Sequence, residues 1–146
     1  SITFSSDVLF RYNSATLTAE SRDTLKEIIP MYLGVLLQSN FRPYLAEIII
    51  EGHTDTDGGY ESNMTLSYNR ANSVARFCLD EANGLTKDQI EQLQSVLTVN
   101  GRSFSSPIYQ TNSTEVDMAA SRRVEIKFRL KEEEMINKIT EVLNQE

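Results

Sequence analysis

The chain has 146 residues and a formal net charge of −7, with 40% hydrophobic and 24% charged residues. These values are ordinary for one globular domain and argue against disorder or a disulfide-built scaffold. The excess of acidic residues gives no electrostatic basis for binding a phosphate backbone, so we expect no nucleic-acid partner. Cys78 is the only cysteine, so no intrachain disulfide is predicted, and cysteine usage does not identify the compartment.

No apolar run reaches the roughly 18 to 20 residues of a membrane-spanning helix. The chain begins at Ser1, shortly before a predicted strand, and no signal sequence precedes that strand. We therefore expect a fragment or a processed form, in which any contact with a membrane is made by a segment before residue 1.

The first half of the chain predicts a strand, a helix and a second strand. A strand is predicted over residues 2–12, where Val8, Phe10 and Tyr12 alternate with Asp7, Leu9 and Arg11, and the apolar Leu9 suggests burial on both faces. Thr18 is the expected N-cap of a helix whose apolar residues recur at helical spacing, and Pro30 within it predicts a kink or a break near residues 28–30. Residues 45–51 contain the β-branched run Ile48, Ile49 and Ile50, which favours a central strand covered on both faces.

The second half predicts two further helices, two strands and a C-terminal helix. Thr86 and Gln89 form a capping-box pattern that begins the shorter of the two helices. In the last strand apolar and charged residues alternate, so one face of that strand should be in water. The expected ranges are 62–80 and 86–93 for the helices, 96–100 and 123–130 for the strands, and 131–146 for the amphipathic C-terminal helix.

This order of elements, βαβα(α)ββ, predicts an α+β sandwich over residues 1–130, followed by a separate C-terminal helix over residues 131–146. Long helices join the strands, which favours a mixed sheet with helices packed on one face. Functional residues should gather where the second strand ends and the second helix begins, because loops at strand ends converge there on a rigid scaffold.

The helix over residues 62–80 carries a charge that points inward. Wound at about 100° per residue, it places one stripe on a single face: Asn63, Ser67, Arg70, Val74, Phe77 and Cys78. The apolar end of the stripe must face the core, so Arg70 also points inward, and a buried guanidinium needs a partner. Asp55 and Asp57, in the preceding loop, are the nearest candidate carboxylates.

A pocket with both charges would suit a zwitterionic ligand, because Asp55 can accept hydrogen bonds from an ammonium and Arg70 can hold a carboxylate in a bidentate fork. A purely structural ion pair between Arg70 and a carboxylate is the alternative, and structural pairs inside folds are common. The residues alone leave both interpretations open.

The same residues resemble a known family. The stretch Glu51-Gly-His-Thr-Asp-Thr-Asp-Gly, followed by residues 63–74, looks like the central motif of OmpA-like peptidoglycan-binding domains. Residues 8–17 resemble the opening strand and turn of that family, and residues 122–126 resemble its closing strand. The resemblance covers about residues 5 to 130 and implies an OmpA-like fold.

The resemblance implies non-covalent binding of peptidoglycan in the periplasm or cell envelope, without catalysis, cofactor or metal. Asp55 and Arg70 fall on the positions that hold the ammonium and carboxylate of diaminopimelate in the stem peptide. Ser121 stands where the family usually has Asn, which puts the outer rim of the site in question. The other matching positions are Thr54, Asn63 and Leu66 in the groove, and Asn13 and Arg122 at its rim.

The long first helix and the additional helix over residues 86–93 exceed a compact member of the family. In this the chain resembles the cell-wall domains of ion-driven motor stators, such as the flagellar motor B subunit and its relatives in Zorya-type phage defence. That likeness implies a wall anchor for a membrane protein or stator-like complex and, by analogy, a homodimer. The alternative is a protein-interaction module that keeps the fold without the ligand.

Other chemistry has little support in the sequence. His53 is the only histidine and is expected to be a hydrogen-bonded structural residue at a strand end. The Asp55-Thr-Asp57-Gly58 stretch lacks the glycine position of an EF-hand, which argues against calcium. No serine elbow, Cys–His set or second metal-binding histidine supports an enzyme. Cys78 is expected to be a buried, protonated thiol.

Overall fold

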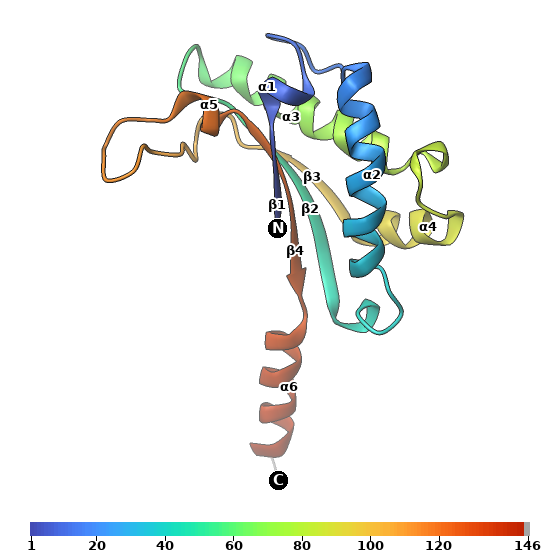
Figure 1. The fold of residues 1–146 in the computed structure, drawn as a ribbon. Helices are drawn as coiled ribbons and strands as arrows, with labels where there is room; N and C mark the ends of the chain where they lie inside the picture. The colour runs from blue at the N-terminus through green and yellow to red at the C-terminus, as the bar shows by residue number, and fades with distance from the viewer. Residues whose placement is uncertain (145–146) are drawn as a thin grey trace.

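The computed structural model describes residues 1–144, of which residues 132–136 and 138 are described by their backbone alone. Its strands are β1 (Ile2–Ser5), β2 (Leu45–His53), β3 (Leu97–Gly101) and β4 (Arg123–Leu130). They form one mixed sheet in the order β1-β4-β2-β3 (Figure 1). Strand β2 is parallel to β3 and antiparallel to β4, and β4 is antiparallel to β1. The position of β2 inside the sheet confirms the prediction of a central strand. The predicted cover on both faces is wrong, because Ile48 and Ile50 are buried in the core while Ile49, on the other face, is only half-buried.

Helices cover one face of this sheet and form a second layer (Figure 1). They are α2 (Ala19–Leu36), α3 (Tyr60–Cys78) and α4 (Lys87–Val96). Their buried apolar side chains form one core with Ile48 and Ile50 of β2 and Ile126 of β4. The predicted α+β fold, a mixed sheet with helices on one face, is therefore confirmed.

Short helical segments join these larger elements. They are α1 (Ser6–Leu9), η1 (Arg42–Tyr44), η2 (Glu81–Asn83) and α5 (Met118–Ser121). Among the described residues, no helix has both the length and the apolar character that crossing a bilayer requires.

Side chains cap α2 and α4 as the sequence predicts. Thr18 Oγ1 accepts a hydrogen bond from the backbone N–H of Ser21 at the start of α2. At the start of α4, Thr86 Oγ1 accepts from the Gln89 N–H at 3.2 Å, and Gln89 Oε1 accepts from the Thr86 N–H at 2.9 Å. These reciprocal bonds complete the predicted capping box.

Of the kink or break predicted near residues 28–30, the break is wrong, because α2 continues through Pro30, and the kink stays a prediction. Pro30 lacks an N–H donor, which weakens a helix when the helix stands alone. Its ring instead packs against Gly84, where an added Cβ would lie 2.6 Å from Pro30 Cγ. Gly84 has a φ of +118° and can make this close approach without a side chain. Tertiary packing thus overrides the local helix-breaking tendency of proline.

The predicted strand over residues 2–12 is too long, because β1 ends at Ser5 and the short helix α1 follows. Leu9 and Phe10 are neighbours in sequence, yet both are almost fully buried. Successive residues of a strand point to opposite faces, so a strand at the edge of a two-layer fold would expose one of them. The Ser21 hydroxyl donates to the Leu9 carbonyl at 3.0 Å, which ties this turn to α2.

The C-terminal helix α6 (Glu132–Asn144) follows β4 directly and extends away from the two layers (Figure 1). Its start agrees with the predicted amphipathic helix, and residues 145–146 of that prediction lie outside the described residues. Ile139 and Leu143 are 55% and 62% exposed, so these two apolar side chains do not pack against the sheet layer. The division into a domain over 1–130 and a separate helix over 131–146 stays a prediction.

Candidate functional site

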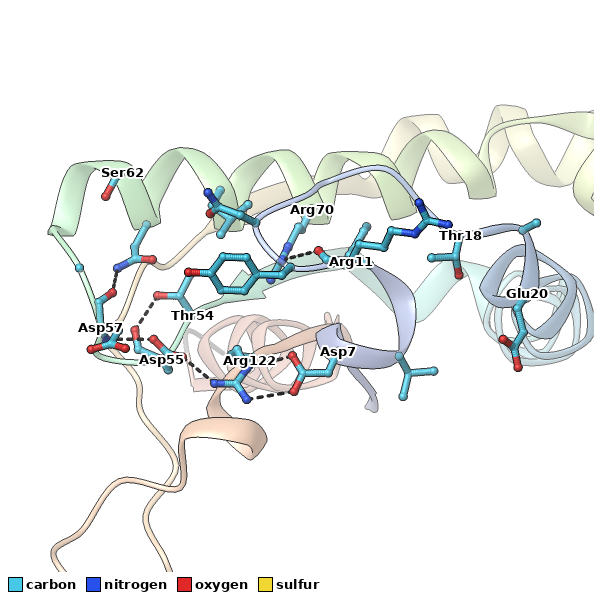
Figure 2. A pocket seen from close by; sticks show the side chains of 18 residues that line it. Asp7, Arg11, Thr18, Glu20, Thr54, Asp55, Asp57, Ser62, Arg70 and Arg122 are labelled. Atoms are coloured by element: carbon cyan, nitrogen blue, oxygen red, sulfur yellow. Dashed lines mark hydrogen bonds and ion pairs between the residues drawn. The ribbon is translucent and has the colours of Figure 1, made fainter.

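A pocket of about 1190 Å³ opens where β2 ends and the loop before α3 begins (Figure 2). Its walls come from that loop, from the first half of α3, from the segment between β1 and α2, from the start of α2 and from Arg122, which directly precedes β4. The structure brings together here all seven residues that the sequence singles out: Asn13, Thr54, Asp55, Asn63, Leu66, Arg70 and Arg122.

The stripe predicted on α3 faces inward. All six of its residues are buried: Asn63, Ser67, Arg70, Val74, Phe77 and Cys78. Because Val74, Phe77 and Cys78 belong to the hydrophobic core, the helix has one rotational setting, and that setting points Arg70 into the pocket wall. The inward-facing charge is therefore confirmed.

The partners of Arg70 are not the predicted ones. Its Nε donates to the Ser14 carbonyl at 2.8 Å and its Nη2 to the Arg11 carbonyl at 3.4 Å. Its guanidinium carbon lies 5.1 Å from the centroid of the Phe10 ring, in cation–π range. The prediction that Asp55 or Asp57 pairs directly with Arg70 is wrong, because a backbone turn and an aromatic ring take that role.

Arg70 is only 6% exposed, and burial lowers its pKa from the ordinary value, while the charges of Asp7 and Asp55 act in the opposite direction. A guanidinium titrates so far above neutral pH that Arg70 stays charged. Within the described part of the chain, no protein group accepts a hydrogen bond from Nη1. Arg70 is therefore a buried cation that lines a pocket and retains N–H donors for an anion.

The carboxylate of Asp55 is paired with Arg122 (Figure 2). Arg122 Nη1 donates to Asp55 Oδ2 at 2.7 Å, while Nε and Nη2 donate to the two oxygens of Asp7 at 2.9 and 3.0 Å. Hydrogen bonds to Asp7 and to Asp55 raise the pKa of Arg122 above its ordinary value. Arg70 and Arg122, two of the arginines that line the pocket, thus have separate sets of partners.

Hydrogen bonds within the loop hold Asp55 in place. The Asp57 N–H donates to Asp55 Oδ1 at 2.9 Å, and Asn63 Nδ2 donates to the Asp57 carbonyl at 2.7 Å. The backbone N–H of Thr54 donates to the Ser103 carbonyl, and Thr54 is buried. Asn63 and Thr54 therefore orient the loop, which keeps the Asp55 carboxylate facing the pocket.

Asp7 and Tyr12 are among the pocket residues that the sequence does not identify as site residues. Asp7 was expected in a strand, and its contact with Arg122 joins positions 115 residues apart, for which the local sequence has no signal. Tyr12 lines the pocket and is 98% exposed, in the turn that Arg70 holds through the carbonyls of Arg11 and Ser14. An exposed aromatic residue at a pocket rim has no periodic pattern that could have identified it.

Ser121, where the family usually has Asn, does not face the pocket. Its side chain is fully buried, and its Oγ accepts a hydrogen bond from the Ile108 N–H at 2.9 Å. It holds the long loop between β3 and α5. The departure from the family pattern therefore affects this loop and leaves the walls of the pocket intact.

A second polar cluster lies on the sheet face away from the helices. His53 Nε2 is 2.8 Å from Glu51 Oε1 and 3.6 Å from Glu125 Oε2. The ligand-type atoms of these three residues lie within 4.8 Å of one another. The ammonium of Lys127 lies 3.0 Å from Glu51 and 3.3 Å from Glu125, so it already supplies a cation to this cluster.

Arg123 completes the charge balance of this cluster, because its Nε lies 2.8 Å from Glu125 Oε1. The sequence predicts that one face of β4 is in water. This prediction is wrong at the first residue of the strand, because Arg123 is only 6% exposed. Burial, and next the charge of Arg123, lower the pKa of His53, while Glu125 and Glu51 act in the opposite direction. His53 is a buried, hydrogen-bonded residue at a strand end, as expected.

Cys78 is 1% exposed, and burial raises the pKa of its thiol to about 12. At neutral pH the thiol is therefore protonated and a poor nucleophile. This confirms the expectation of a core cysteine.

The model of the OmpA family matches residues 9–122, which is more than half of the 146 residues. The chain belongs to the OmpA family. The match includes the loop with Asp55, the whole of α3 and Arg122. The family suggested by the Glu51–Gly58 motif is therefore confirmed.

Among sequence relatives, this OmpA-family chain is 34% identical over 143 residues to the Zorya protein ZorB of Escherichia coli strain Crooks, covering 92% of this chain and 59% of the relative. The chain spans about half the length of the ZorB relatives that it matches. A Zorya protein is thus among the sequence relatives of this chain, in line with the resemblance to Zorya-type relatives.

Solved structures give the same fold. The periplasmic domain of Helicobacter pylori MotB (residues 97–256) matches with a TM-score of 0.68 and 20% identity, covering 99% of this chain and 90% of that one. The cell wall anchor of the T6SS from Pseudomonas aeruginosa matches with a TM-score of 0.55 and 27% identity, covering 85% and 76%. The OmpA-like sandwich predicted from the sequence is therefore confirmed.

Proposed function

We propose that this protein binds peptidoglycan non-covalently through the diaminopimelate of the stem peptide. The side-chain end of diaminopimelate carries an ammonium and a carboxylate on one carbon. Asp55 accepts hydrogen bonds from the ammonium, and Arg70 donates to the carboxylate. This interaction attaches the protein to peptidoglycan, and no covalent bond is made or broken.

The observation that carries the proposal is the state of Arg70. It is a nearly buried cation whose protein partners are two carbonyls and an aromatic ring, with no carboxylate among its contacts in the described residues. A buried charge is costly unless an opposite charge compensates it. The carboxylate of a ligand would supply that charge, with Asp55 in the same pocket to receive the adjoining ammonium.

The relatives support this assignment. One solved structure of similar fold is described as the cell wall anchor of the T6SS, and another as a peptidoglycan-associated lipoprotein. From these relatives we infer that the protein is located in the periplasm or cell envelope. The likeness to ZorB and MotB further supports a role in anchoring a stator-like complex. As parts of this proposal, the protein forms a homodimer, and its contact with a membrane is made by a segment outside this chain.

Co-sedimentation with purified insoluble sacculi tests the proposal. The wild-type chain should pellet with sacculi, and Asp55→Asn and Arg70→Ala should stay in the supernatant, because loss of one charged partner costs about 2 to 5 kcal/mol. Asp55→Asn is the cleaner variant, since Arg70 also holds the turn at Arg11 and Ser14.

Arg76→Ala provides a matched control, because it removes an exposed arginine from the same helix. It should pellet like the wild type, and circular dichroism should be the same for all four proteins. Wild-type pelleting that survives Asp55→Asn contradicts the proposal. No pelleting of the wild type favours the interaction module that keeps the fold without the ligand.

A further inference from the structure

Arg122 is hydrogen-bonded to the carboxylate of Asp55, the group that would accept hydrogen bonds from a ligand ammonium. Its Nη1 lies 2.7 Å from Asp55 Oδ2, and Asp55 is only 15% exposed (Figure 2). An ammonium brought to the same carboxylate would meet a second positive charge within a few ångströms, which opposes its binding. A cation of the protein therefore competes with the ligand for Asp55.

Asp7 offers Arg122 a second place to bind. The two oxygens of Asp7 accept from Nε and Nη2 in a parallel, bidentate arrangement, which is the strongest geometry for this pair of groups. Only one hydrogen bond joins Arg122 to Asp55. Arg122 can thus lose its bond to Asp55 and keep two bonds to Asp7.

We infer that Asp7 is a positioning residue of the ammonium-binding half of the pocket: it holds Arg122 when a ligand ammonium takes Asp55. This inference rests on the proposed function, because it assumes that the ammonium binds Asp55. Without Asp7, Asp55 would be the only carboxylate in contact with Arg122 among the described residues, so Arg122 would hold it more firmly.

The charges in the pocket are consistent with this role. A zwitterion brings no net charge, so its binding at Asp55 and Arg70 leaves the total charge of the pocket unchanged, and Arg122 can remain bound to Asp7. Asp7 is 51% exposed and Arg122 is 31% exposed, so solvent screens their attraction. The expected effect of losing Asp7 is therefore moderate.

Calorimetric titration with a soluble tripeptide that ends in diaminopimelate tests the inference on four proteins: the wild type, Asp7→Asn, Arg122→Gln and the double variant. Asp7→Asn should weaken binding about five-fold, in line with an exposed ion pair. The double variant should bind more tightly than Asp7→Asn, because the competing guanidinium is gone. A purely structural role of Asp7 would not produce this recovery.

Two further variants serve as controls. Asp7→Glu retains a carboxylate that can reach Arg122 and should keep the wild-type affinity. Asp23→Asn removes one negative charge from an exposed position of α2 and should also have no effect. Thermal unfolding of each variant shows that the fold is intact.

The outcomes separate this inference from the proposed function. If Asp7→Asn binds the tripeptide with wild-type affinity, the inference is overturned and the proposed function is not. The same holds if Asp7→Asn lowers the affinity by the same factor in the wild type and in Arg122→Gln. Failure of the wild-type chain to bind the tripeptide overturns the proposed function and this inference together.

Discussion

Gly52 of β2 and Ser67 of α3 bring the strand and the helix into direct backbone contact. A Cβ added to Gly52 would lie 2.0 Å from the carbonyl oxygen of Ser67 and 2.8 Å from its carbonyl carbon. The Ser67 hydroxyl in turn accepts a hydrogen bond from the Ser103 N–H at 3.0 Å. This contact fixes the first half of α3 against the end of β2, and with it the relative positions of Asp55 and Arg70.

Gly52→Ala should therefore destabilise the protein strongly. The atoms that the new methyl group would meet belong to the backbone, so no side-chain rotation can relieve the overlap. We expect a loss of about 3 kcal/mol in the free energy of unfolding, at the upper end of the range for overpacked sites. Urea denaturation followed by circular dichroism measures it.

Gly34→Ala is the matched control and should have the opposite effect. Gly34 lies within α2, and an added Cβ would be 3.7 Å from its nearest neighbour, Gln89 Nε2, which is an ordinary contact. Alanine in a helix interior is about 1 kcal/mol better than glycine. Wild-type stability of Gly52→Ala would show that β2 and α3 can move apart without cost.

The stability of the protein should depend on pH through His53. Its pKa in the folded protein is lowered, first by burial and then by the charge of Arg123, so the unfolded chain binds the proton more readily. The stability contribution is full above the ordinary histidine value of about 6.5 and is lost as the pH falls below it. Urea midpoints measured from pH 7.5 to pH 5 should fall for the wild type.

His53→Gln should flatten this part of the curve. Glu51 and Glu125 titrate in a separate and lower window. Burial raises the pKa of each carboxyl, but Lys127 and His53 together lower the pKa of Glu51 below its ordinary value, and Arg123, His53 and Lys127 together lower that of Glu125. Their contribution is lost only as the pH falls below about 4.5. A wild-type midpoint that stays constant from pH 7.5 to pH 5 contradicts the assignment to His53.

Lys127→Met should destabilise the fold by leaving Glu51 without its cation. The Lys127 ammonium lies 3.0 Å from Glu51, whose side chain is 6% exposed. Removing one partner of a buried pair is costly, but Lys127 is 41% exposed, so we expect only about 1 to 2 kcal/mol. Adding Glu51→Gln to this variant should recover part of the loss, which a double-mutant cycle measures.

Arg129→Met serves as the comparison for Lys127→Met, because it lies two residues further along the same face of β4. Its pair with Glu47 has a separation of 3.5 Å, and its side chain is 52% exposed. Such a pair contributes little, so a double-mutant cycle of Arg129→Met and Glu47→Gln should give a coupling energy below about 1 kcal/mol. Equal coupling energies for the Lys127–Glu51 and Arg129–Glu47 pairs would show that burial of Glu51 does not matter.

The sequence predicted those parts of the fold that depend on local patterns. The 3.6-residue period of α3 located Arg70 on the buried face, and the side chains of Thr18 and Thr86 identified helix starts, because capping is a contact between near neighbours. The Glu51–Gly58 motif is also a local pattern, because its residues are consecutive. Those of its residues that line the pocket are Thr54, Asp55, Asp57 and Gly58.

The contacts that the sequence did not predict are non-local or involve the backbone. Arg70 binds the carbonyls of Arg11 and Ser14, groups that every residue type possesses and that leave no mark in the sequence. Arg122 reaches Asp7 across 115 positions, and that contact exists only once the strands have paired. The sequence therefore predicts a carboxylate near in the chain, Asp55 or Asp57, as the partner of Arg70, whereas its observed partners, Arg11 and Ser14, lie 59 and 56 positions away.

The proposed ligand leads to a last prediction: peptidoglycan fragments with diaminopimelate should bind more tightly than fragments with lysine at the same position. Lysine keeps the ammonium that Asp55 receives and lacks the adjoining carboxylate, so Arg70 would have no external anion. The Ser14 carbonyl and the Phe10 ring would still stabilise the Arg70 guanidinium, which limits the loss. We therefore expect a difference of about ten-fold.

Calorimetry with matched soluble muropeptides measures this difference, and a fragment whose diaminopimelate carboxylate is amidated should resemble the lysine form. Arg70→Lys should reduce the discrimination, because an ammonium cannot hold a carboxylate in a bidentate fork. Equal affinity of the wild type for the diaminopimelate and lysine forms would show that Arg70 acts only within the fold, where it holds the turn between Arg11 and Ser14 against Phe10.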